Sequence, residues 1–327
     1  MNTQYSLLAA WPPVVAGVVT LLTTKLMLAS PIFKQIQDVP NERSLHDRPV
    51  PRIGGLALML GVLTAWQLLN DQVTAWLFAG VMILMLISLV DDLRGLPAKW
   101  RLLGHLAVAI VFVRWGMAPI PTYLTLLFVV GVAWMTNLYN FMDGANGLAG
   151  GMAAIGFGFY ALAAWLASDV NFALMSLAIV AASLAFLTFN FGKAMVFMGD
   201  AGSIPLGFLA GVIGLLGWQR GLWPLWFPAV IFSSFILDAT VTLFKRLLRA
   251  ERVWEAHREH YYQRLIRMGF SHQNTALIEY GLMLISGGFA MVAIHQPFTV
   301  VVGLLGLCLL IKLYLMRLVD LRWQLHG

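Results

Sequence analysis

The chain has 327 residues, of which 60% are hydrophobic and only 11% are charged, and its mean hydropathy is +0.80. A water-soluble chain of this length would carry about 25% charged residues, so the composition excludes an ordinary soluble protein. The net charge of +6 does not indicate nucleic-acid binding, because the basic residues are confined to particular loops, as membrane topology signals are. The single cysteine, Cys308, excludes a disulfide within the chain.

Apolar runs long enough to cross a bilayer recur along the whole chain, since a membrane-spanning helix needs about 17–25 such residues. The sequence therefore predicts an all-α polytopic membrane protein with about eleven transmembrane helices. No repeat or linker divides it, so residues 1–327 are expected to form a single domain. The predicted spans are residues 7–30, 56–69, 73–90, 102–115, 123–136, 151–166, 172–189, 204–218, 226–244, 276–294 and 298–316.

Lys and Arg residues are concentrated in alternate loops, and this asymmetry predicts the orientation. The other set of loops carries little positive charge beyond Arg220 and Arg114. Because cytoplasmic loops hold the excess of Lys and Arg, we expect the N-terminus outside and the C-terminus in the cytoplasm. The basic loops contain Lys34, Arg43, Arg48, Arg52, Arg94, Lys99, Arg101, Lys193 and the polar segment 245–273.

Acidic and polar residues follow several predicted spans on this same side. They include Asp91, Asp92, Asn137, Asn140, Asp143, Asn146, Asn190, Asp200, His257 and His260. A carboxylate close to hydrocarbon costs about 2.5–3.5 kcal/mol on insertion scales, so such residues are candidates for function. Polar groups gathered at one interface favour chemistry on a water-soluble substrate that meets a membrane component. A transporter would place them nearer the bilayer midplane.

Each acidic motif has a chemical and a purely structural interpretation. Asp91 and Asp92 are adjacent carboxylates that suit Mg²⁺, a basic partner or proton transfer, although a solvated helix end would read the same way. Asp200 lies among small residues just before an apolar run, which suits Mg²⁺ shared with substrate phosphates or, alternatively, a tight turn. Asp143 and its neighbouring Asn and Gly residues are either a binding loop or a polar turn.

The polar segment near residue 260 offers a basic surface. His257 and His260 would share a face of a helix, and Arg258 lies between them. No cysteine or spaced third ligand accompanies them, so phosphate binding fits better than zinc, and a positive-inside anchor is the structural alternative. Asp238 is expected to pair with the nearby Lys245 or Arg246.

Taken in order, these motifs resemble the polyprenyl-phosphate N-acetylhexosamine-1-phosphate transferases, glycosyltransferase family 4, which include MraY, WecA and TagO. The likeness rests on Arg48-Pro49-Val50-Pro51-Arg52-Ile53-Gly54-Gly55, Asp91-Asp92, Asn140-Phe141-Met142-Asp143-Gly144, Phe197-Met198-Gly199-Asp200-Ala201-Gly202-Ser203 and His257-Arg258-Glu259-His260-Tyr261-Tyr262-Gln263-Arg264. It is strongest to the WbpL-type branch, which begins O-antigen or related surface glycans. The muramyl-pentapeptide branch instead has a run of consecutive histidines in the last motif.

The resemblance implies a reaction between undecaprenyl phosphate and a UDP-N-acetylhexosamine that gives undecaprenyl-diphospho-sugar and UMP. It implies Mg²⁺ as cofactor, with Mn²⁺ as a substitute, and a site on the cytoplasmic face of a bacterial inner membrane. Asp200 would bind the metal, with Asp143 as a second candidate ligand. Asp91, Asp92 and Asp143 would be catalytic, with Asp91 or Asp92 as a base. The substrate-binding residues would be Arg52, Asn137, Asn140, Asn146, Asn190, His257, Arg258 and His260.

One position departs from the family pattern Asp-Gly-x-Asp-Gly, because this chain has Asn146 in place of the second acid. Asn can donate and accept hydrogen bonds, so we expect altered nucleotide affinity rather than lost activity. The alternatives are a Mg²⁺-dependent membrane prenyltransferase and a cation-coupled transporter that uses Asp238 and Glu279. The sequence leaves open the sugar, a one-step or a covalent two-step mechanism, and whether the protein is a homodimer.

Overall fold

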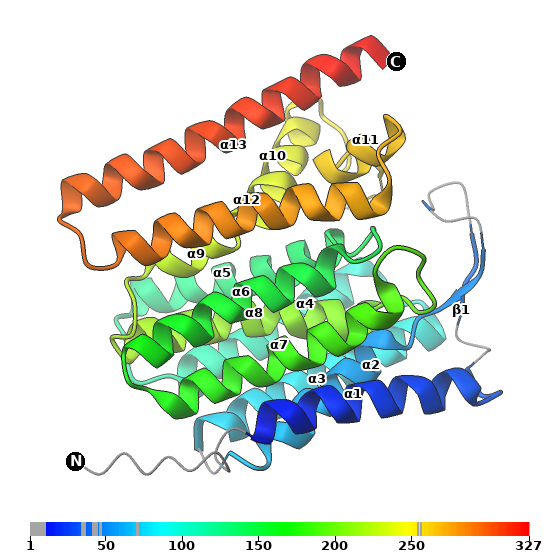
Figure 1. Ribbon diagram of the computed structural model, residues 1–327, viewed down its shortest axis with the longest axis horizontal. Helices are drawn as coiled ribbons and strands as arrows, with labels where there is room; N and C mark the ends of the chain where they lie inside the picture. The colour runs from blue at the N-terminus through cyan, green and yellow to red at the C-terminus, as the bar shows by residue number, and fades with distance from the viewer. Residues whose placement is uncertain are drawn as a thin grey trace.

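The computed structural model is a bundle of long helices, most of which run in nearly the same direction (Figure 1). It describes residues 11–33, 37–40, 45, 48–69, 72–253, 255 and 257–326, without the side chains of residues 72–74, 92, 93 and 326. Helices form nearly all the regular structure in this part of the chain, because a helix satisfies its own backbone N–H and C=O groups where hydrocarbon cannot. The predicted all-α class is confirmed.

Every predicted apolar run overlaps a helix. The helices are α1 (Trp11–Ala29), α2 (Gly54–Trp66), α3 (Gln72–Arg94), α4 (Ala98–Val111) with a π-helical turn (Phe112–Gly116), α5 (Thr122–Phe141), α6 (Leu148–Leu166), α7 (Val170–Asn190), α8 (Asp200–Gln219), α9 (Trp226–Ile231), α10 (Ser233–Leu248), α11 (Tyr261–Arg267), α12 (His272–Ala293) and α13 (Phe298–His326). Within the described residues, 7 helices are long and apolar enough to cross a membrane: α1, α5, α6, α7, α8, α12 and α13. The count of about eleven spans and their orientation stay predictions.

Helix α8 lies at the centre of the bundle, where it packs against α5, α3, α2 and α6. Its first turn touches the first turn of α2 so closely that a Cβ added to Gly55 would lie 2.4 Å from Cα of Gly202. The Gly54 and Gly55 N–H groups donate to the carbonyl oxygens of Phe197 and Met198, both at 2.9 Å. Two motifs that are far apart in sequence therefore form one backbone unit.

A short antiparallel pair of strands joins the same unit, and the sequence did not predict it. Strand β1 (Gln37–Asp38) pairs with β2 (Val50–Pro51), and the Phe197 N–H donates to the Pro51 carbonyl oxygen at 2.8 Å. Arg52, which follows β2, reaches back to Asp38 with a distance of 2.6 Å between Nη2 and Oδ1. The strands thus hold the loop before α2 against the start of α8.

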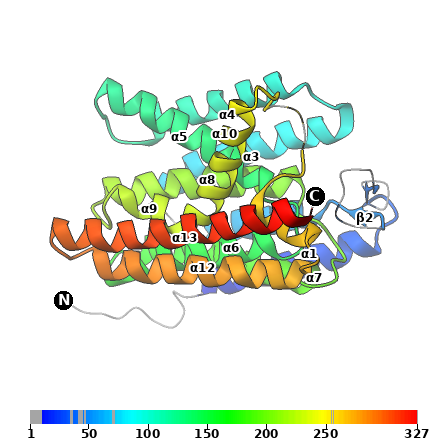
Figure 2. The same cartoon turned by 90° about the horizontal axis from the view of Figure 1, so that it is seen from above.

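The span predicted over residues 226–244 is interrupted, because α9 ends at Ile231 and α10 begins at Ser233. The Ser233 hydroxyl donates to the Val230 carbonyl oxygen at 2.6 Å, which competes with a regular helical bond there. Phe232 at the break is buried against Tyr139 and Tyr160. In both views α10 runs across the direction of the long helices (Figures 1 and 2).

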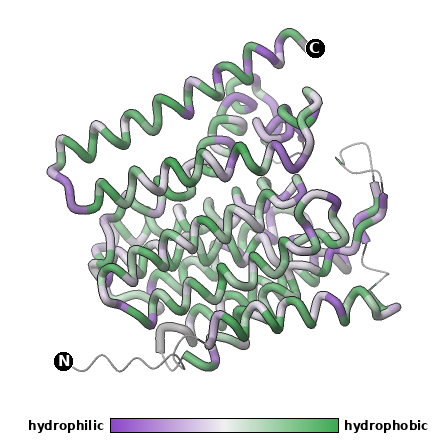
Figure 3. The backbone as a smooth tube through the Cα atoms, viewed as in Figure 1, coloured by the Kyte–Doolittle hydropathy of each residue, from purple (hydrophilic) through white to green (hydrophobic). Residues whose placement is uncertain are grey.

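Hydrophilic residues are most concentrated at the end of the bundle that carries α11 and the strands (Figure 3). The lengths of the helices between the two ends are mostly hydrophobic in the same view. The loops between α5 and α6 and between α7 and α8 reach this end, together with the segment before α11. The fold therefore gathers the sequence motifs at one end of the bundle.

Candidate functional site

A cavity of about 310 Å³ opens at this end, and we call it the polar cavity. Six of the predicted site residues line it: Arg52, Asn140, Asp143, Asn146, Asn190 and Asp200. The remaining lining residues are Asp38, Leu45, Gly144, Ala145, Phe197, Gly199, Gln263 and His272. Residues from four separate loops thus converge as the motif order predicts.

Asp143 and Asp200 are the acidic centre of the polar cavity. Asp200 begins α8, and Gly199 before it has a φ of +68°, a conformation that side-chain-bearing residues rarely adopt. This turn directs the Gly199 N–H to the Asp143 carboxylate, which accepts it. The surrounding protein displaces bulk water from Asp143, and this burial, together with the Asp200 carboxylate, raises the pKa of Asp143 well above its ordinary value.

Asn140 connects this acidic centre to α8. Its side-chain oxygen accepts a hydrogen bond from the Ser203 hydroxyl at 2.6 Å, and its amide is hydrogen-bonded to Asp200. The Ser203 hydroxyl also lies 3.2 Å from the Gly199 carbonyl oxygen. Asn140 therefore fixes the Asp200 carboxylate relative to the end of α5.

The donor set fits a Mg²⁺ ion that is completed by substrate. No group of three His, Cys, Asp or Glu residues that could hold a metal occurs among the described residues. Mg²⁺ is usually bound by one or two carboxylates together with substrate phosphates and water, and Mn²⁺ accepts the same oxygen donors. The Asp143 and Asp200 carboxylates repel each other, so a divalent cation held by both would relieve a cost that the residues alone leave.

A second and larger cavity of about 660 Å³ adjoins the first, and we call it the amphipathic cavity. Its apolar lining includes Leu102, Leu106, Val130, Ala133, Trp134, Ile204 and Leu243. Its polar lining includes Arg101, His105, Asn137, Glu255, His257 and His260. Asn140 and Gln263 line both cavities, so the two cavities are immediate neighbours.

Asp91 reaches the site through a basic residue. The Arg101 guanidinium Nη1 lies 2.8 Å from Asp91 Oδ2 and 3.5 Å from Asp200 Oδ2. The other Asp91 oxygen accepts the Leu96 N–H at 2.7 Å, which holds the turn after α3. The side chain of Asp92 lies outside the described residues, so its predicted catalytic role stays a prediction.

Asn146 and Asn190 hold the two loops of the polar cavity together. The Asn146 side-chain amide donates to the Gly192 carbonyl oxygen at 2.8 Å, and its N–H donates to His272 Nδ1 at 3.2 Å. Asn190 accepts the Gly147 N–H at 2.7 Å and donates to the Val196 carbonyl oxygen at 2.8 Å. Both residues line the cavity, but these bonds already give them a structural task.

The histidine segment is anchored by Asp238, and the predicted pairing of Asp238 with Lys245 or Arg246 is wrong. Asp238 Oδ1 instead lies 3.1 Å from His260 Nδ1. Lys245 pairs with Asp320 at 2.6 Å. Arg246 pairs with Glu259 at 2.7 Å.

The two histidines of this segment line the amphipathic cavity, whereas Arg258 lines neither cavity. The rings of His257 and His260 have centroids 4.8 Å apart. Burial lowers the pKa of His257 to about 4, and the nearby Arg246 guanidinium acts in the same direction, so the His257 ring is neutral at neutral pH. Its Nδ1 accepts the Glu259 N–H at 3.3 Å.

Sequence reasoning missed six polar cavity-lining residues: Asp38, Arg101, His105, Glu255, Gln263 and His272. Arg101 was counted only as a topology signal, although His105 follows it at a spacing that places both on one face of α4. A hydrogen bond of 3.2 Å joins His105 Nδ1 to Asn137 Oδ1, and Asn137 donates to the Ala133 carbonyl oxygen at 2.7 Å. The helical spacing was the signal that could have identified His105.

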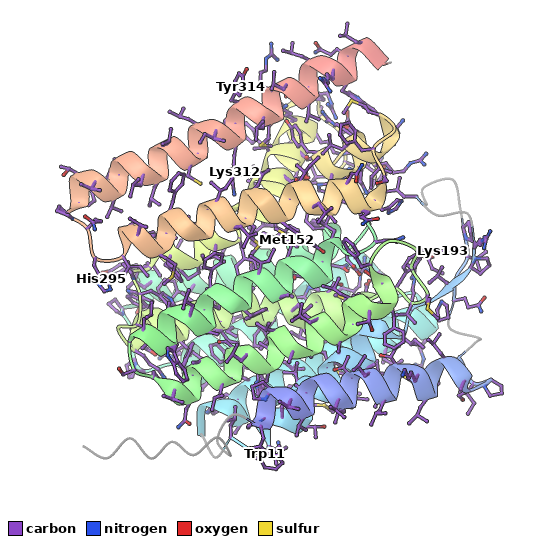
Figure 4. All side chains as sticks on the ribbon, viewed as in Figure 1. Trp11, Met152, Lys193, His295, Lys312 and Tyr314 are labelled. Atoms are coloured by element: carbon purple, nitrogen blue, oxygen red, sulfur yellow. The ribbon has the colours of Figure 1, made fainter. Side chains whose placement is uncertain are left out.

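A third cavity of about 410 Å³ is mostly apolar and lies between α12, α13, α10 and α11. Glu279 and Lys312 line it and are both buried, and Lys312 extends from α13 on the side that faces α12 (Figure 4). Lys312 Nζ donates to the Ser234 hydroxyl at 3.2 Å. This is the place that the transporter alternative would have used.

Comparisons with known proteins decide between these alternatives. Residues 74–217, which contain Asp91, Asp143 and Asp200, match the sequence profile "Glycosyl transferase family 4". The chain is 33% identical over 295 residues to a probable undecaprenyl-phosphate N-acetylglucosaminyl 1-phosphate transferase of Bacillus subtilis, with 82% of this chain and 81% of the relative covered. It is 31% identical to the decaprenyl-phosphate N-acetylglucosaminephosphotransferase of Mycobacterium tuberculosis, with 74% and 71% covered.

A third relative is the undecaprenyl-phosphate alpha-N-acetylglucosaminyl 1-phosphate transferase of Escherichia coli K12, at 27% identity with 78% of this chain and 76% of the relative covered. These relatives are matched over most of both chains. Neither a transporter nor a prenyltransferase is needed to account for the motifs. The chain belongs to glycosyl transferase family 4 and is a polyprenyl-phosphate sugar-1-phosphate transferase.

Proposed function

We propose that the protein transfers an N-acetylhexosamine 1-phosphate from a UDP-sugar to undecaprenyl phosphate, which gives undecaprenyl-diphospho-sugar and UMP. The observation that carries this proposal is the pair of adjoining cavities. One is polar and acidic, the other is largely apolar with a basic end, and both are lined by Asn140 and Gln263. A nucleotide sugar matches the polar cavity, and a lipid phosphate matches the apolar cavity with its basic end.

The polar cavity suits the donor substrate. A UDP-sugar brings a diphosphate, a uracil ring and sugar hydroxyls, and the cavity offers Arg52 together with the amides of Asn140, Asn146 and Asn190. Mg²⁺ held by Asp200 and Asp143 would neutralise the diphosphate and the charge that develops on the leaving UMP. Asn140 would keep Asp200 oriented while the nucleotide binds.

The amphipathic cavity suits the acceptor substrate. Its apolar wall from α4 and α5 matches a polyprenyl chain, and Arg101, His257 and His260 match the phosphate at the end of that chain. A phosphate oxygen of the acceptor would attack the β-phosphorus of the UDP-sugar, and the bond from that phosphorus to the bridging oxygen of UMP would break. Such a transfer needs positioning and charge neutralisation more than covalent catalysis, so we favour one-step attack over an aspartyl-phosphate intermediate.

We place this site on the cytoplasmic face of a bacterial inner membrane, where the excess of Lys and Arg is expected. The relatives carry names that specify N-acetylglucosamine, so UDP-GlcNAc is the first donor to test. Initiation of O-antigen or a related surface glycan, as in the WbpL-type branch, is the role that we propose for the product. The apolar surface of the bundle is compatible with a homodimer, so the oligomeric state of the purified protein would be measured as well.

The experiment is UMP release by the purified protein with undecaprenyl phosphate and each of UDP-GlcNAc, UDP-GalNAc, UDP-QuiNAc and UDP-FucNAc. We expect release with at least one donor, its loss with EDTA and its return with added Mg²⁺. Asp200→Ala should nearly eliminate release, because it removes one of two carboxylates at the proposed metal site.

Asp169→Asn is the matched control. Asp169 accepts the Phe172 N–H at the start of α7 and pairs with Arg220, and it lines neither cavity. Asn can keep the helix cap, so we expect normal release. Undiminished release by Asp200→Ala, or in EDTA, would refute the proposed chemistry.

A further inference from the structure

Asp238 and His260 form a buried carboxylate–histidine pair beside the amphipathic cavity, with side chains 5% and 4% exposed. We propose that Asp238 is a positioning residue that makes His260 a hydrogen-bond acceptor next to the donor His257, so that the two rings together recognise a phosphate monoester bearing one P–OH group. This inference rests on the proposed function, because the phosphate monoester it names is the lipid acceptor.

The carboxylate of Asp238 is held by donors on every side. Oδ1 accepts from His260 Nδ1 at 3.1 Å, from the Tyr261 N–H at 2.9 Å and from the Thr242 hydroxyl at 3.3 Å. Oδ2 accepts the Tyr262 N–H at 3.0 Å. An ionised carboxylate accepts hydrogen bonds and has no proton to donate. His260 Nδ1 must therefore carry the proton of this contact.

The plane of the His260 ring is fixed as well. Phe141 stacks on it with ring centroids 6.2 Å apart, and Tyr262 stacks with centroids 6.0 Å apart. The Tyr262 hydroxyl donates to the Phe141 carbonyl oxygen at 3.0 Å, which ties the two aromatic neighbours together. Because Nδ1 contacts Asp238 and His260 lines the amphipathic cavity, Nε2 is the ring nitrogen left to meet a ligand.

The two histidines have opposite hydrogen-bonding characters. If the Nδ1 proton is the only ring proton of His260, its Nε2 is bare and can only accept. His257 Nδ1 accepts the Glu259 N–H at 3.3 Å, so its neutral ring carries the proton on Nε2 and can donate. Their centroids are 4.8 Å apart and both residues line the amphipathic cavity. A monoprotonated phosphate supplies the matching pair, with a P–O⁻ for His257 and a P–OH for His260.

A structural role for Asp238 is the competing explanation, because its two backbone contacts hold the first turn of α11. The two explanations differ in whether Asp238 acts through His260. If it does, removing the negative charge of Asp238 has little further effect once the imidazole has gone. If it only supports α11, the two losses multiply.

The test is a double-mutant cycle of Asp238→Asn, His260→Gln and the double variant. For each we would measure kcat and KM for undecaprenyl phosphate and for the UDP-sugar. We expect each single variant to lower kcat/KM for the lipid by about 10–100-fold, as loss of a histidine-orienting carboxylate does elsewhere, with KM for the UDP-sugar unchanged. The double variant should be no worse than either single variant. Losses that multiply in the double variant would overturn the proposal.

Thr242→Val is the matched control on the same helix, since it removes one donor to Asp238 and leaves the contact with His260. We expect its kcat/KM to stay within about threefold of wild type. A loss as large as that of Asp238→Asn would mean that packing around Asp238, and not its bond to His260, is what matters.

Nitrogen-15 NMR of histidine-labelled wild-type protein keeps the inference testable if Asp238→Asn does not fold. The His260 signals are those missing in His260→Gln, and we expect a protonated Nδ1 and a bare Nε2. A proton on Nε2, with or without one on Nδ1, would overturn the proposal. This spectrum is independent of the activity: a wild-type protein that releases no UMP from any donor would refute the proposed function, and the tautomer would still decide the Asp238–His260 relationship.

Discussion

Arg101 joins Asp91 to Asp200, with its Nη1 2.8 Å from one carboxylate and 3.5 Å from the other. Arg101 lies in α4, Asp91 in α3 and Asp200 in α8. One guanidinium therefore links two acidic motifs from different helices. Because Arg101 also lines the amphipathic cavity, it stands between the proposed metal site and the proposed acceptor phosphate. Its positive charge can therefore act on the carboxylates of the proposed metal site and on the proposed acceptor phosphate.

We therefore predict that Arg101→Gln lowers kcat/KM for undecaprenyl phosphate more than any other loss of a basic residue at this end of the bundle. A hydrogen bond to a charged group contributes about 1.5–3 kcal/mol, which corresponds to about 10-fold to 150-fold in rate. The kcat/KM of Arg101→Lys should fall between those of wild type and Arg101→Gln, since a single ammonium replaces the forked guanidinium. The measurement is steady-state UMP release.

The control for this prediction is Arg114→Gln. Arg114 is exposed in the π-helical turn that follows α4, and it lines neither cavity. Its replacement should leave kcat/KM within about twofold, as expected for an exposed charge far from the site. Equal losses in the two variants would point to general electrostatics of the bundle rather than to the Asp91–Arg101–Asp200 contact.

Asp143 makes the metal-free protein sensitive to pH. Its pKa is raised by burial and by Asp200, so its contribution to stability is favourable below the ordinary carboxyl pKa and is lost as the pH rises through the raised value. Asp143→Asn stays neutral, so in EDTA the variant should melt at least about 2 °C above wild type at pH 8. This difference should shrink as the pH is lowered to 5.

Saturating Mg²⁺ should reverse this order, because the wild-type carboxylate can bind the cation and the amide binds it poorly. Asp169→Asn serves as the control and should show neither effect. A variant that is less stable than wild type at pH 8 in EDTA would show that the Asp143 carboxylate is favourably held without a cation.

The helices and the convergence of the acids could be predicted from sequence, since apolar runs must be helical in hydrocarbon and the loops between them emerge in alternation. The break at Phe232 and the β1–β2 pair could not. They depend on the packing of Phe232 against Tyr139 and Tyr160 and on the Phe197 bond to Pro51, which are tertiary contacts with no local pattern.

The candidate site shows the same division between local and distant determinants. Asp143 and Asp200 were predicted because their motifs are short and self-contained. Asp238 was mispaired because Lys245 and Arg246 lie on its own helix, whereas its actual partner His260 comes from a separate segment. Arg101 was overlooked because it falls in a predicted cytoplasmic loop, where a basic residue needs no function beyond topology, whereas in the structure it lies in α4.

Asn146 differs from the family pattern, and its contact explains why an amide suits this chain. Its side-chain NH₂ donates to the Gly192 carbonyl oxygen, a bond that a carboxylate cannot make. Asn146→Asp should therefore destabilise the protein by about 1–3 kcal/mol, because it sets a charged oxygen against a carbonyl oxygen. We expect retained UMP release with a changed KM for the UDP-sugar, measured beside a thermal melt.

Asn171→Asp, at an exposed position in the second residue of α7, is the control and should leave the melting temperature and KM unchanged. An Asn146→Asp variant with wild-type stability and improved affinity would show that the loop can adapt to the family's usual acid.

The orientation of the bundle can be tested with one residue from each end. Lys193 and His295 are both exposed, and they lie at opposite ends of the helices (Figure 4). We expect Lys193→Cys to react with a membrane-impermeant maleimide only in inverted vesicles and His295→Cys only in spheroplasts, because the end with Lys193 carries the excess of basic residues.

The wild-type chain supplies the background, since its single cysteine, Cys308, is buried. Both variants should keep UMP release, as neither residue lines the two site cavities. Labelling of Lys193→Cys from outside would place the acidic site on the periplasmic side and exclude a cytoplasmic UDP-sugar as the donor.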